Sequence, residues 1–449
     1  MNARARTLLL QLFSFLALIL VIVPLSGCGG SGTAPASIVM PLIGPAGPQR
    51  VAPRAQWDFL VYLDGDNNLE NNAIENFLQM EQIGSSNDVN ILVLFDRIPG
   101  YDDSHGNWTN TRLYRITKNV SGDRSQFVST YLKDFGEANM ADPQTLTNFI
   151  TYCHQWFPAD HVALTLWDHG GGVYPRSLAA SGSHGSLARG IAWDDTTGSG
   201  AWDCLTTDQV AAALQNARAQ TGQKINISNL DACLMQLMEV AYQWRNETDY
   251  LVGSEETVPA AGNKYDAILN DLAVNPAIAP RDYALALVND YYHYYQGQPG
   301  YDTTYSALDL GQIGNVFQRF SDFAAKLNAV PDNLLVYIKN ARTATTSFDY
   351  PELVDLTDFL IRLQAQPGSG AGLVNAAAAL QTALTNLIIA NQGSGVYPLA
   401  HRTYGLGILF PASLSDWQYY SDSNRYPLLG LAQDTEWDSF IARYVNYAH

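Results

Sequence analysis

Cysteine is scarce in this chain, with only four among 449 residues: Cys28, Cys153, Cys204 and Cys233. No Cys-x-x-Cys pair and no Cys/His spacing typical of a zinc site occurs. If Cys28 carries a lipid, as argued below, three cysteines remain, and an odd number leaves at least one thiol free in an oxidising compartment. The count excludes a disulfide scaffold and leaves room for a reactive cysteine.

Basic residues are also few: 25 Lys and Arg stand against 43 Asp and Glu, a formal net charge of −18. No Lys/Arg run or stripe is present, so nucleic acid is not expected as a partner. An acidic surface suits an extracellular enzyme and mildly favours cationic substrates through long-range steering. No internal repeat is found.

The only long apolar run at the start of the chain extends over residues 8–23, preceded by Arg4 and Arg6 and followed by Leu-Ser-Gly-Cys28. It is short for a membrane span and has the layout of a signal peptide. The Cys after Leu-Ser-Gly resembles the bacterial lipoprotein signal, which predicts a signal peptide over 1–27 and lipidation of Cys28. An ordinary secretory signal or a membrane anchor is the alternative. We therefore expect a cell-envelope protein outside the cytoplasm, touching the membrane only through its lipid. Residues 28–55, rich in Gly and Pro, are expected to be a tether.

Apolar runs alternate with helical patterns from Trp57 onward. Strands are expected at 57–63, 89–96, 161–168, 224–231 and 250–256. Helices are expected near 70–82, 143–156 and 234–246, and within 205–222, a segment with an N-cap and a Gly stop. Near-continuous apolar strands separated by helices predict an α/β fold, with a parallel-dominated sheet covered on both faces, over residues 56–275.

Residues 276–449 have a different composition, with Tyr-rich and Ala-rich helical stretches and two strand-like pieces at 303–310 and 404–411. A mixed, largely helical C-terminal region is expected there. Its Tyr cluster at 291, 292, 294 and 295 is interpreted as a partly buried helix face rather than a ligand platform.

Two of the expected strands end at residues able to do chemistry. LTLWDHGGG ends at His169 followed by three glycines, and INISNLDACLM ends at Cys233. Parallel sheets place their chemistry at the carboxyl ends of strands. Alone, the Cys is explained as a small buried hydrophobe and the His as part of a tight turn, but together they predict a catalytic dyad. A helix beginning at Leu234 would place the thiol at its positive end and favour the thiolate.

These motifs resemble the clostripain-like cysteine peptidases, relatives of gingipains, legumains and caspases. WDHGGG and NLDACLM carry the resemblance, supported by LVYLDGDNNLE, IAWDDTTGSGAWDCLTTDQV, GSEETVPAAGNKY, YSALDL and GLGILFP. The resemblance implies a caspase-like fold in which Cys233 forms a thioester with the substrate. His169 would protonate the leaving amine and then activate water. The N–H groups of Gly170 and Cys233 would form the oxyanion hole.

The same resemblance places an acid, here Asp231, in the pocket for a basic P1 side chain, with Glu255 and Glu256 as further candidates. Preference for Arg or Lys is therefore expected. The sequence departs from the family after Pro259, where Lys264 falls near a position that is acidic in many relatives.

The segment between Gly170 and Leu205 is long and rich in Gly and Ser, which is typical of a lid or a processing site. Relatives are often cut there. Arg176 and Arg189 are its basic residues and the candidate cleavage points.

No metal and no cofactor is expected. Asp64 and Asp66 open a segment with some likeness to a calcium loop, and Glu75 falls at its twelfth position. However, Leu69 stands where an EF-hand needs glycine and Asn71 where it needs an apolar residue, so a structural turn is the preferred interpretation.

The expected function is an extracytoplasmic cysteine endopeptidase acting on peptides or proteins. A catalytically silent binding or adhesion lipoprotein with the same fold is the alternative from another class. Transpeptidation, with an amine in place of water as acceptor, is a third possibility.

Overall fold

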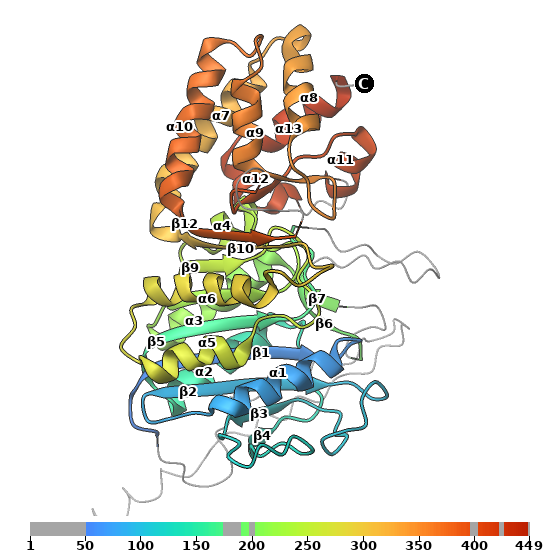
Figure 1. Cartoon of the computed structure of the whole chain (residues 1–449). Helices are drawn as coiled ribbons and strands as arrows, with labels where there is room; N and C mark the ends of the chain where they lie inside the picture. The colour runs from blue at the N-terminus through green and yellow to red at the C-terminus, as the bar shows by residue number, and fades with distance from the viewer. Residues whose placement is uncertain (1–50, 174–189, 197–202, 396–402, 422–425, 448–449) are drawn as a thin grey trace, which may run out of the picture. The chain divides into compact units, whose positions relative to one another are not determined.

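A nine-stranded sheet forms the centre of the computed structural model, which describes residues 51–173, 190–196, 203–395, 403–421 and 426–447 (Figure 1). The strand order is β12-β10-β9-β8-β5-β1-β2-β3-β4. The five central strands are parallel: β1 (Ala55–Gly65), β2 (Val89–Arg97), β5 (Ala159–Trp167), β8 (Ile225–Asp231) and β9 (Thr248–Gly253). This confirms the expected α/β class.

Both faces of the parallel strands are apolar because helices cover both. On β1, Phe59, Val61 and Leu63 belong to one buried cluster, while Leu60 and Tyr62 belong to the other. The first cluster includes side chains of α1 (Glu70–Ile83), α5 (Tyr265–Val274) and α6 (Pro280–Tyr295). The second includes those of α2 (Pro143–Trp156), α3 (Thr207–Thr221) and α4 (Met238–Trp244). Burying both faces removes a large apolar area from water and is the main stabilising term.

Local signals fix several helix ends where the sequence predicted them. Asp142 accepts a hydrogen bond from Gln144 N at 2.8 Å and caps α2, whose first residue is Pro143. Thr206 and Gln209 form a capping box at the start of α3, and Gly222 ends that helix with φ 73°. After Gly222 the chain enters β8, one of the two strands that precede the candidate site.

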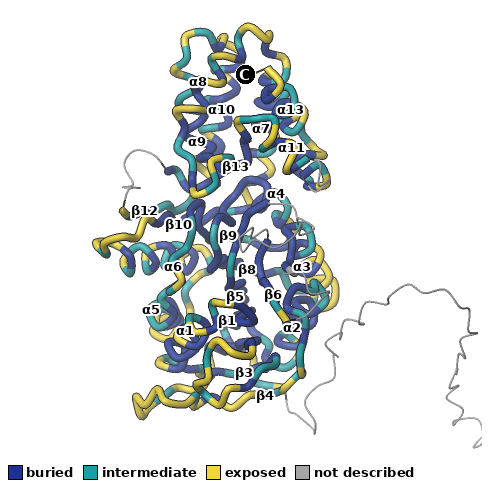
Figure 2. The backbone as a smooth tube through the Cα atoms, turned by 90° about the vertical axis from the view of Figure 1, so that its right-hand side faces the viewer, coloured by how far each residue is buried: buried dark blue, intermediate teal, exposed yellow. Residues whose placement is uncertain are grey.

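The strands toward both edges of the sheet are antiparallel, which agrees with the expected parallel-dominated sheet. The antiparallel strands are β3 (Arg112–Arg115), β4 (Tyr131–Asp134), β10 (Thr303–Asp309) and β12 (Ile388–Ser394). β3 and β4 lie between the expected strand at 89–96 and the expected helix at 143–156, where no strand was predicted. β10 pairs with β9, so the sheet continues across the expected boundary between residues 275 and 276. Figure 2 shows the buried central strands and the more exposed β4 edge.

The C-terminal region is largely helical, as expected. Its helices are α7 (Ile313–Asn328), α8 (Leu335–Ala344), α9 (Leu356–Gln364), α10 (Ala371–Leu387), α11 (Leu414–Ser421), α12 (Gly430–Asp434) and α13 (Trp437–Tyr447). A small antiparallel pair, β11 (Leu353–Asp355) and β13 (Gly407–Leu409), lies among them. On α6, Tyr291 and Tyr295 are buried, which confirms a partly buried Tyr face. None of the described helices is both long and apolar enough to cross a lipid bilayer.

Candidate active site

His169 and Cys233 follow neighbouring parallel strands in register. Trp167, the last residue of β5, pairs with Asp231, the last residue of β8, and each of the two candidates comes two positions later. Asp168 N also donates a hydrogen bond to Asp231 O at 3.3 Å. The sheet therefore brings the His motif and the Cys motif to the same edge, as the sequence predicted.

Gly170 packs directly against the backbone of Cys233. A Cβ atom on Gly170 would lie 2.2 Å from Cys233 O and 2.7 Å from Cys233 N. Such distances are far inside van der Waals contact, so any side chain here would push the two loops apart. Glycine after the His is therefore a steric requirement for the two motifs to meet. The Gly170 N–H also hydrogen-bonds the Cys233 thiol.

The expected helix beginning at Leu234 is wrong. α4 begins at Met238, and the intervening backbone is bonded to the strand-end loop instead: Leu234 N donates to Glu256 O at 3.1 Å, and Gln236 N to Ser254 O at 3.0 Å. Leu234 has φ 62°, a left-handed conformation that costs a branched residue energy and marks strain at functional sites. Cys233 consequently stands on a sharp turn and not at a helix N-terminus.

The environment of the Cys233 thiol disfavours the thiolate in the resting protein. Burial raises its pKa to about 11, although backbone hydrogen bonds from Val258 and Gly170 oppose that rise, and the charges of Glu256 and Asp231 add to it. Val258 N lies 3.2 Å from Sγ. The expectation of a helix dipole lowering this pKa is thus corrected. Cys233 is nevertheless partly exposed, whereas Cys153 and Cys204 are buried, and none of the three forms a disulfide.

The His169 ring is held by a residue that the sequence analysis assigned only to a turn. His169 Nε2 lies 2.7 Å from Asn68 Oδ1, and because an amide oxygen only accepts, this bond places a proton on Nε2. Burial lowers the pKa of His169, which favours the neutral imidazole. The neighbouring Asn67 donates to Asp168 Oδ1 at 2.8 Å and to Trp193 O at 2.9 Å. The sequence held one signal for this role. Asn67 and Asn68 follow β1, and β1 is the neighbour of β5, the strand that leads to His169.

Asp231 is buried, with its carboxylate bound by the chain's own donors. Asn263 N lies 3.1 and 3.0 Å from its two oxygens, and Tyr265 OH lies 2.8 Å from Oδ2. Burial raises its pKa despite these bonds. No Arg, Lys or His in the described ranges forms an ion pair with it. Lys264, the departure from the family pattern, pairs with Asp266 at 2.9 Å instead.

The two neighbouring glutamates lie in different surroundings. Glu255 is buried, shares a hydrogen bond with Asp355, and accepts from Gly405 N at 3.0 Å, so its carboxyl faces the C-terminal region. Glu256 accepts from Thr257 N at 2.7 Å and from Asp349 N at 3.2 Å, and its charge acts on Cys233. The structure thus brings Glu256, but not the carboxyl of Glu255, to the surroundings of the thiol.

Residues 66–69 form the turn between β1 and α1. Asp64 Oδ1 accepts from Asp66 N at 3.2 Å, and Asn67 Oδ1 accepts from Leu69 N at 2.8 Å. Glu75 pairs with Arg124 at 2.7 Å on the surface. The expected lipidation site Cys28 and the candidate cleavage points Arg176 and Arg189 lie outside the described residues.

Comparison with known proteins agrees with this geometry. The model of the clostripain family matches residues 61–444. The chain belongs to the clostripain family. A curated relative, clostripain from Hathewaya histolytica, is 33% identical over 226 residues, a match that spans 47% of this chain and 41% of the relative.

Solved structures of the family share the fold. A secreted C11 cysteine protease from Bacteroides thetaiotaomicron, solved in complex with an irreversible peptide inhibitor, has a TM-score of 0.61 at 20% identity and covers 86% of this chain and 100% of its own. An inactive zymogen C11 protease from Parabacteroides distasonis has a TM-score of 0.60 at 20% identity, covering 86% and 99%. The expected caspase-like α/β architecture of this family is confirmed.

Proposed function

We propose that this protein is an extracytoplasmic cysteine endopeptidase that cleaves peptide bonds through Cys233 and His169. The observation that carries the proposal is the contact between Gly170 and Cys233, because it fixes the loop after His169 directly against the backbone of the nucleophile. A thiol that is partly exposed and a His held by a separate hydrogen bond are the parts a thioester mechanism needs.

Cys233 and His169 are both uncharged in the resting protein, so the thiol proton must pass to the imidazole during the reaction. Because Asn68 occupies Nε2 of His169, Nδ1 is the nitrogen that takes part in acid/base chemistry. The thiol attacks the scissile carbonyl as it loses its proton, and the His169 imidazolium then protonates the leaving amine. The N–H groups of Gly170 and Cys233 stabilise the oxyanion that forms. Water, activated by His169, then releases the acid product.

A basic P1 side chain is the substrate feature we propose, recognised by Asp231 with help from Glu256. Asp231 is a buried carboxylate at the end of β8 without a cationic partner among the described residues, and the guanidinium of Arg or the ammonium of Lys would supply that charge. Glu255 is assigned a structural role, since its carboxyl is bound to Asp355 and Gly405.

We also propose that the chain is cleaved between the His and Cys motifs and is anchored through a lipid on Cys28. Cleavage after Arg176 or Arg189 would open the segment between the two motifs while the paired strands β5 and β8 hold the fragments together. Lipidation at Cys28 would tether the enzyme to the cell envelope. Intact-mass measurement on the mature protein and on Cys233→Ala distinguishes self-cleavage, which the variant lacks, from cleavage by another peptidase, which it retains.

A P1-diverse library of fluorogenic peptides tests the function. Wild type is expected to hydrolyse peptides with Arg or Lys at P1, and Cys233→Ala and His169→Ala are expected to lose at least about 1,000-fold in kcat. Cys153→Ala is the matched control, since this thiol is buried on α2 away from the strand ends. Full activity in Cys233→Ala would contradict the mechanism, and no hydrolysis by folded wild type would favour a silent binding protein.

A further inference from the structure

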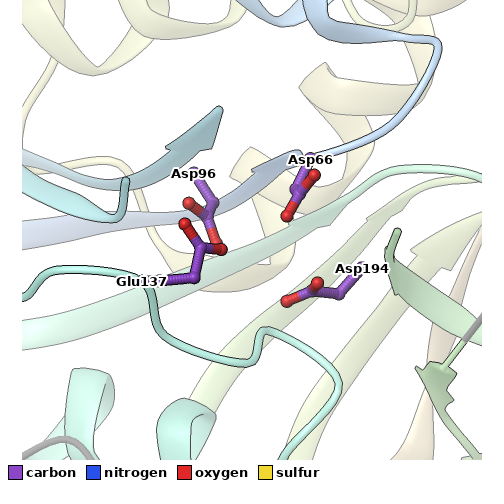
Figure 3. A group of neighbouring side chains, drawn as sticks. All are labelled: Asp66, Asp96, Glu137 and Asp194. Atoms are coloured by element: carbon purple, nitrogen blue, oxygen red, sulfur yellow. The ribbon is translucent and has the colours of Figure 1, made fainter. Parts of the chain in front are cut away.

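The two sides of the candidate site are surrounded by different chemical groups. On the side of His169, four carboxyl groups point toward a common centre close to the loop that holds the imidazole ring (Figure 3). They belong to Asp66, Asp96, Glu137 and Asp194. On the side of Cys233, the loop after β9 is held by the side-chain hydroxyl groups of Ser254 and Thr304. These hydroxyl groups carry no charge, so any effect on Cys233 comes through the position of the chain.

The loop of residues 254–258, which follows β9, is bonded to the turn that carries Cys233. Leu234 N and Gln236 N donate to two of its carbonyl oxygens, at 3.1 and 3.0 Å. Val258 N donates to Cys233 Sγ at 3.2 Å. Burial raises the pKa of the thiol, and the bond from Val258 opposes that rise. The position of the loop therefore affects both the backbone of the turn and the environment of the sulfur.

The loop begins where β9 leaves the sheet, so its N–H groups need partners from outside the backbone ladder. β9 and β10 pair as far as Gly253 and Ser306. Two residues further along an antiparallel ladder, residue 304 would stand opposite residue 255. The side chain of Thr304 replaces the ladder there: its Oγ1 accepts from Glu255 N and from Glu256 N, each at 3.1 Å. The hydroxyl group thus satisfies two donors that the sheet no longer satisfies.

The Thr304 hydroxyl uses its full hydrogen-bonding capacity. A hydroxyl group has two lone pairs and one proton. The two N–H groups of the loop occupy the lone pairs, so the proton is directed to Ser254 Oγ, 3.0 Å away. Ser254 Oγ also accepts from Glu256 N at 3.1 Å. Thr304 and Ser254 are both buried, so bulk water does not compete for these bonds.

We propose that Thr304 is a positioning residue for the nucleophile: its hydroxyl group holds the loop 254–258 in place, and this loop holds Cys233. Thr304 acts through the loop and not on the reacting atoms. The proposal rests on the proposed function, in which Cys233 attacks the substrate. Thr304 lies beyond residue 275, so the region expected to be a separate C-terminal part contributes to the active site. Misplacement of a reacting group by about 1 Å costs on the order of 100-fold in rate, so a small shift of the loop should be measurable.

The neighbouring Thr303 provides a matched control on the same strand. Thr303 is also buried, and its Oγ1 lies 2.7 Å from Ser394 Oγ on β12. Successive side chains of a strand point to opposite faces, so the two threonines bond to different segments. Thr303→Val therefore removes a buried hydroxyl group and a bond to β12 but leaves the bonds to the loop 254–258 in place.

Kinetics of the full chain test the role, with the fluorogenic peptide that wild type cleaves fastest. Val has the shape of Thr but no acceptor, so Thr304→Val leaves Glu255 N without its partner. We expect kcat to fall about 10- to 100-fold while KM changes by less than about threefold. Thr304→Ser keeps the hydroxyl group and should stay within about threefold of the wild-type kcat. Thr303→Val should keep the wild-type kcat even where its Tm is lowered as much as that of Thr304→Val.

Alkylation of Cys233 provides a second measurement that requires no peptidase activity. A shifted loop weakens the bond from Val258 N to Sγ, so less thiolate is present at a given pH. The rate of iodoacetamide alkylation at Cys233, followed by peptide mass spectrometry at about pH 9, should fall at least about threefold in Thr304→Val. Thr304→Ser and Thr303→Val should react as wild type does.

A wild-type kcat or a wild-type alkylation rate in Thr304→Val would overturn the proposal. So would an equal loss of kcat in Thr303→Val, or a loss that Thr304→Ser does not restore. If Thr304→Val does not fold, Ser254→Ala takes its place, because it removes only the acceptor of the Thr304 proton and one acceptor of Glu256 N. Its kcat should fall about 3- to 10-fold, and an unchanged kcat would overturn the proposal. Folded wild type that cleaves no peptide would instead refute the proposed function, and the alkylation rates would still decide whether Thr304 holds Cys233.

Discussion

Asn68 Oδ1 lies 2.7 Å from Nε2 of His169, which makes an uncharged amide the group that orients the ring. A carboxylate in this place would favour the imidazolium, whereas an amide leaves the imidazole neutral. Burial acts in the same direction, since it lowers the pKa of His169. The arrangement holds the ring without charging it.

Replacement of Asn68 should therefore impair the chemical step. Asn68→Ala frees the ring to rotate and is expected to lower kcat by about 10- to 100-fold with little change in KM. Asn68→Asp keeps an acceptor but adds a negative charge, which raises the pKa of His169, so the acidic limb of the kcat/KM profile should move to higher pH. Wild-type kcat in Asn68→Ala would show that the bond does not position the His.

The Cys233 thiol should react slowly with alkylating agents at neutral pH. Its pKa is raised to about 11 by burial, so the thiolate fraction keeps growing through pH 8 to 10. The rate of iodoacetamide alkylation at Cys233, followed by peptide mass spectrometry, is expected to rise about tenfold per pH unit over that range. Cys153 and Cys204 serve as buried reference thiols. A rate that is already level from pH 6 upward would indicate a resting thiolate–imidazolium pair instead.

Asp231→Asn should remove the preference for basic P1 residues. Loss of the charge-assisted bond is expected to lower kcat/KM for Arg and Lys peptides about 100-fold, with a much smaller effect on a norleucine P1 peptide. Tyr265→Phe is the control, because it removes the hydroxyl that donates to Asp231 Oδ2 but keeps the carboxylate. Equal losses for Arg and norleucine peptides in Asp231→Asn would point to a role in loop structure alone.

Glu255→Gln should change the pH dependence of stability rather than specificity. Burial raises the pKa of Glu255 well above its usual value and that of Asp355 to about 7, and the two share a hydrogen bond. Both folded pKa values exceed the unfolded ones, so the wild type loses stability as pH rises from about 4 through 7 and beyond. The Gln side chain of the variant donates a hydrogen bond to Asp355 but has no group that titrates. Between pH 5 and 8 the free energy of unfolding of the variant should therefore rise by about 1 kcal/mol or more relative to that of wild type. Unfolding free energies that change with pH in parallel for the two proteins would contradict this.

The sequence predicted best those elements whose local residue pattern agrees with their place in the folded sheet. β1, β2 and β5 are mostly apolar on both faces, so their runs were visible without knowledge of the fold. The arrival of His169 and Cys233 at one edge followed from parallel topology alone. The helix start at Pro143 and the glycine stop at Gly222 were equally local signals.

Other features depend on tertiary contacts that a linear pattern does not carry. β3 and β4 are four-residue strands, too short to be recognised, and β4, the strand at the edge of the sheet, is partly exposed. The segment 234–237 has helical composition, but the N–H groups of Leu234 and Gln236 donate to Glu256 and Ser254, so the helix starts later. The positioning role of Asn68 required the distance to His169, which only the folded sheet provides.

Covalent labelling with an inhibitor tests the central claim most directly. A peptidyl acyloxymethyl ketone with Arg at P1 is incubated with the mature protein, and the modified residue is located by peptide mapping. A single adduct is expected on Cys233, with none on Cys153 or Cys204, and its rate should fall at least about 100-fold in His169→Ala. An adduct on another residue, or equal labelling of Cys233 in wild type and His169→Ala, would contradict a Cys233–His169 peptidase.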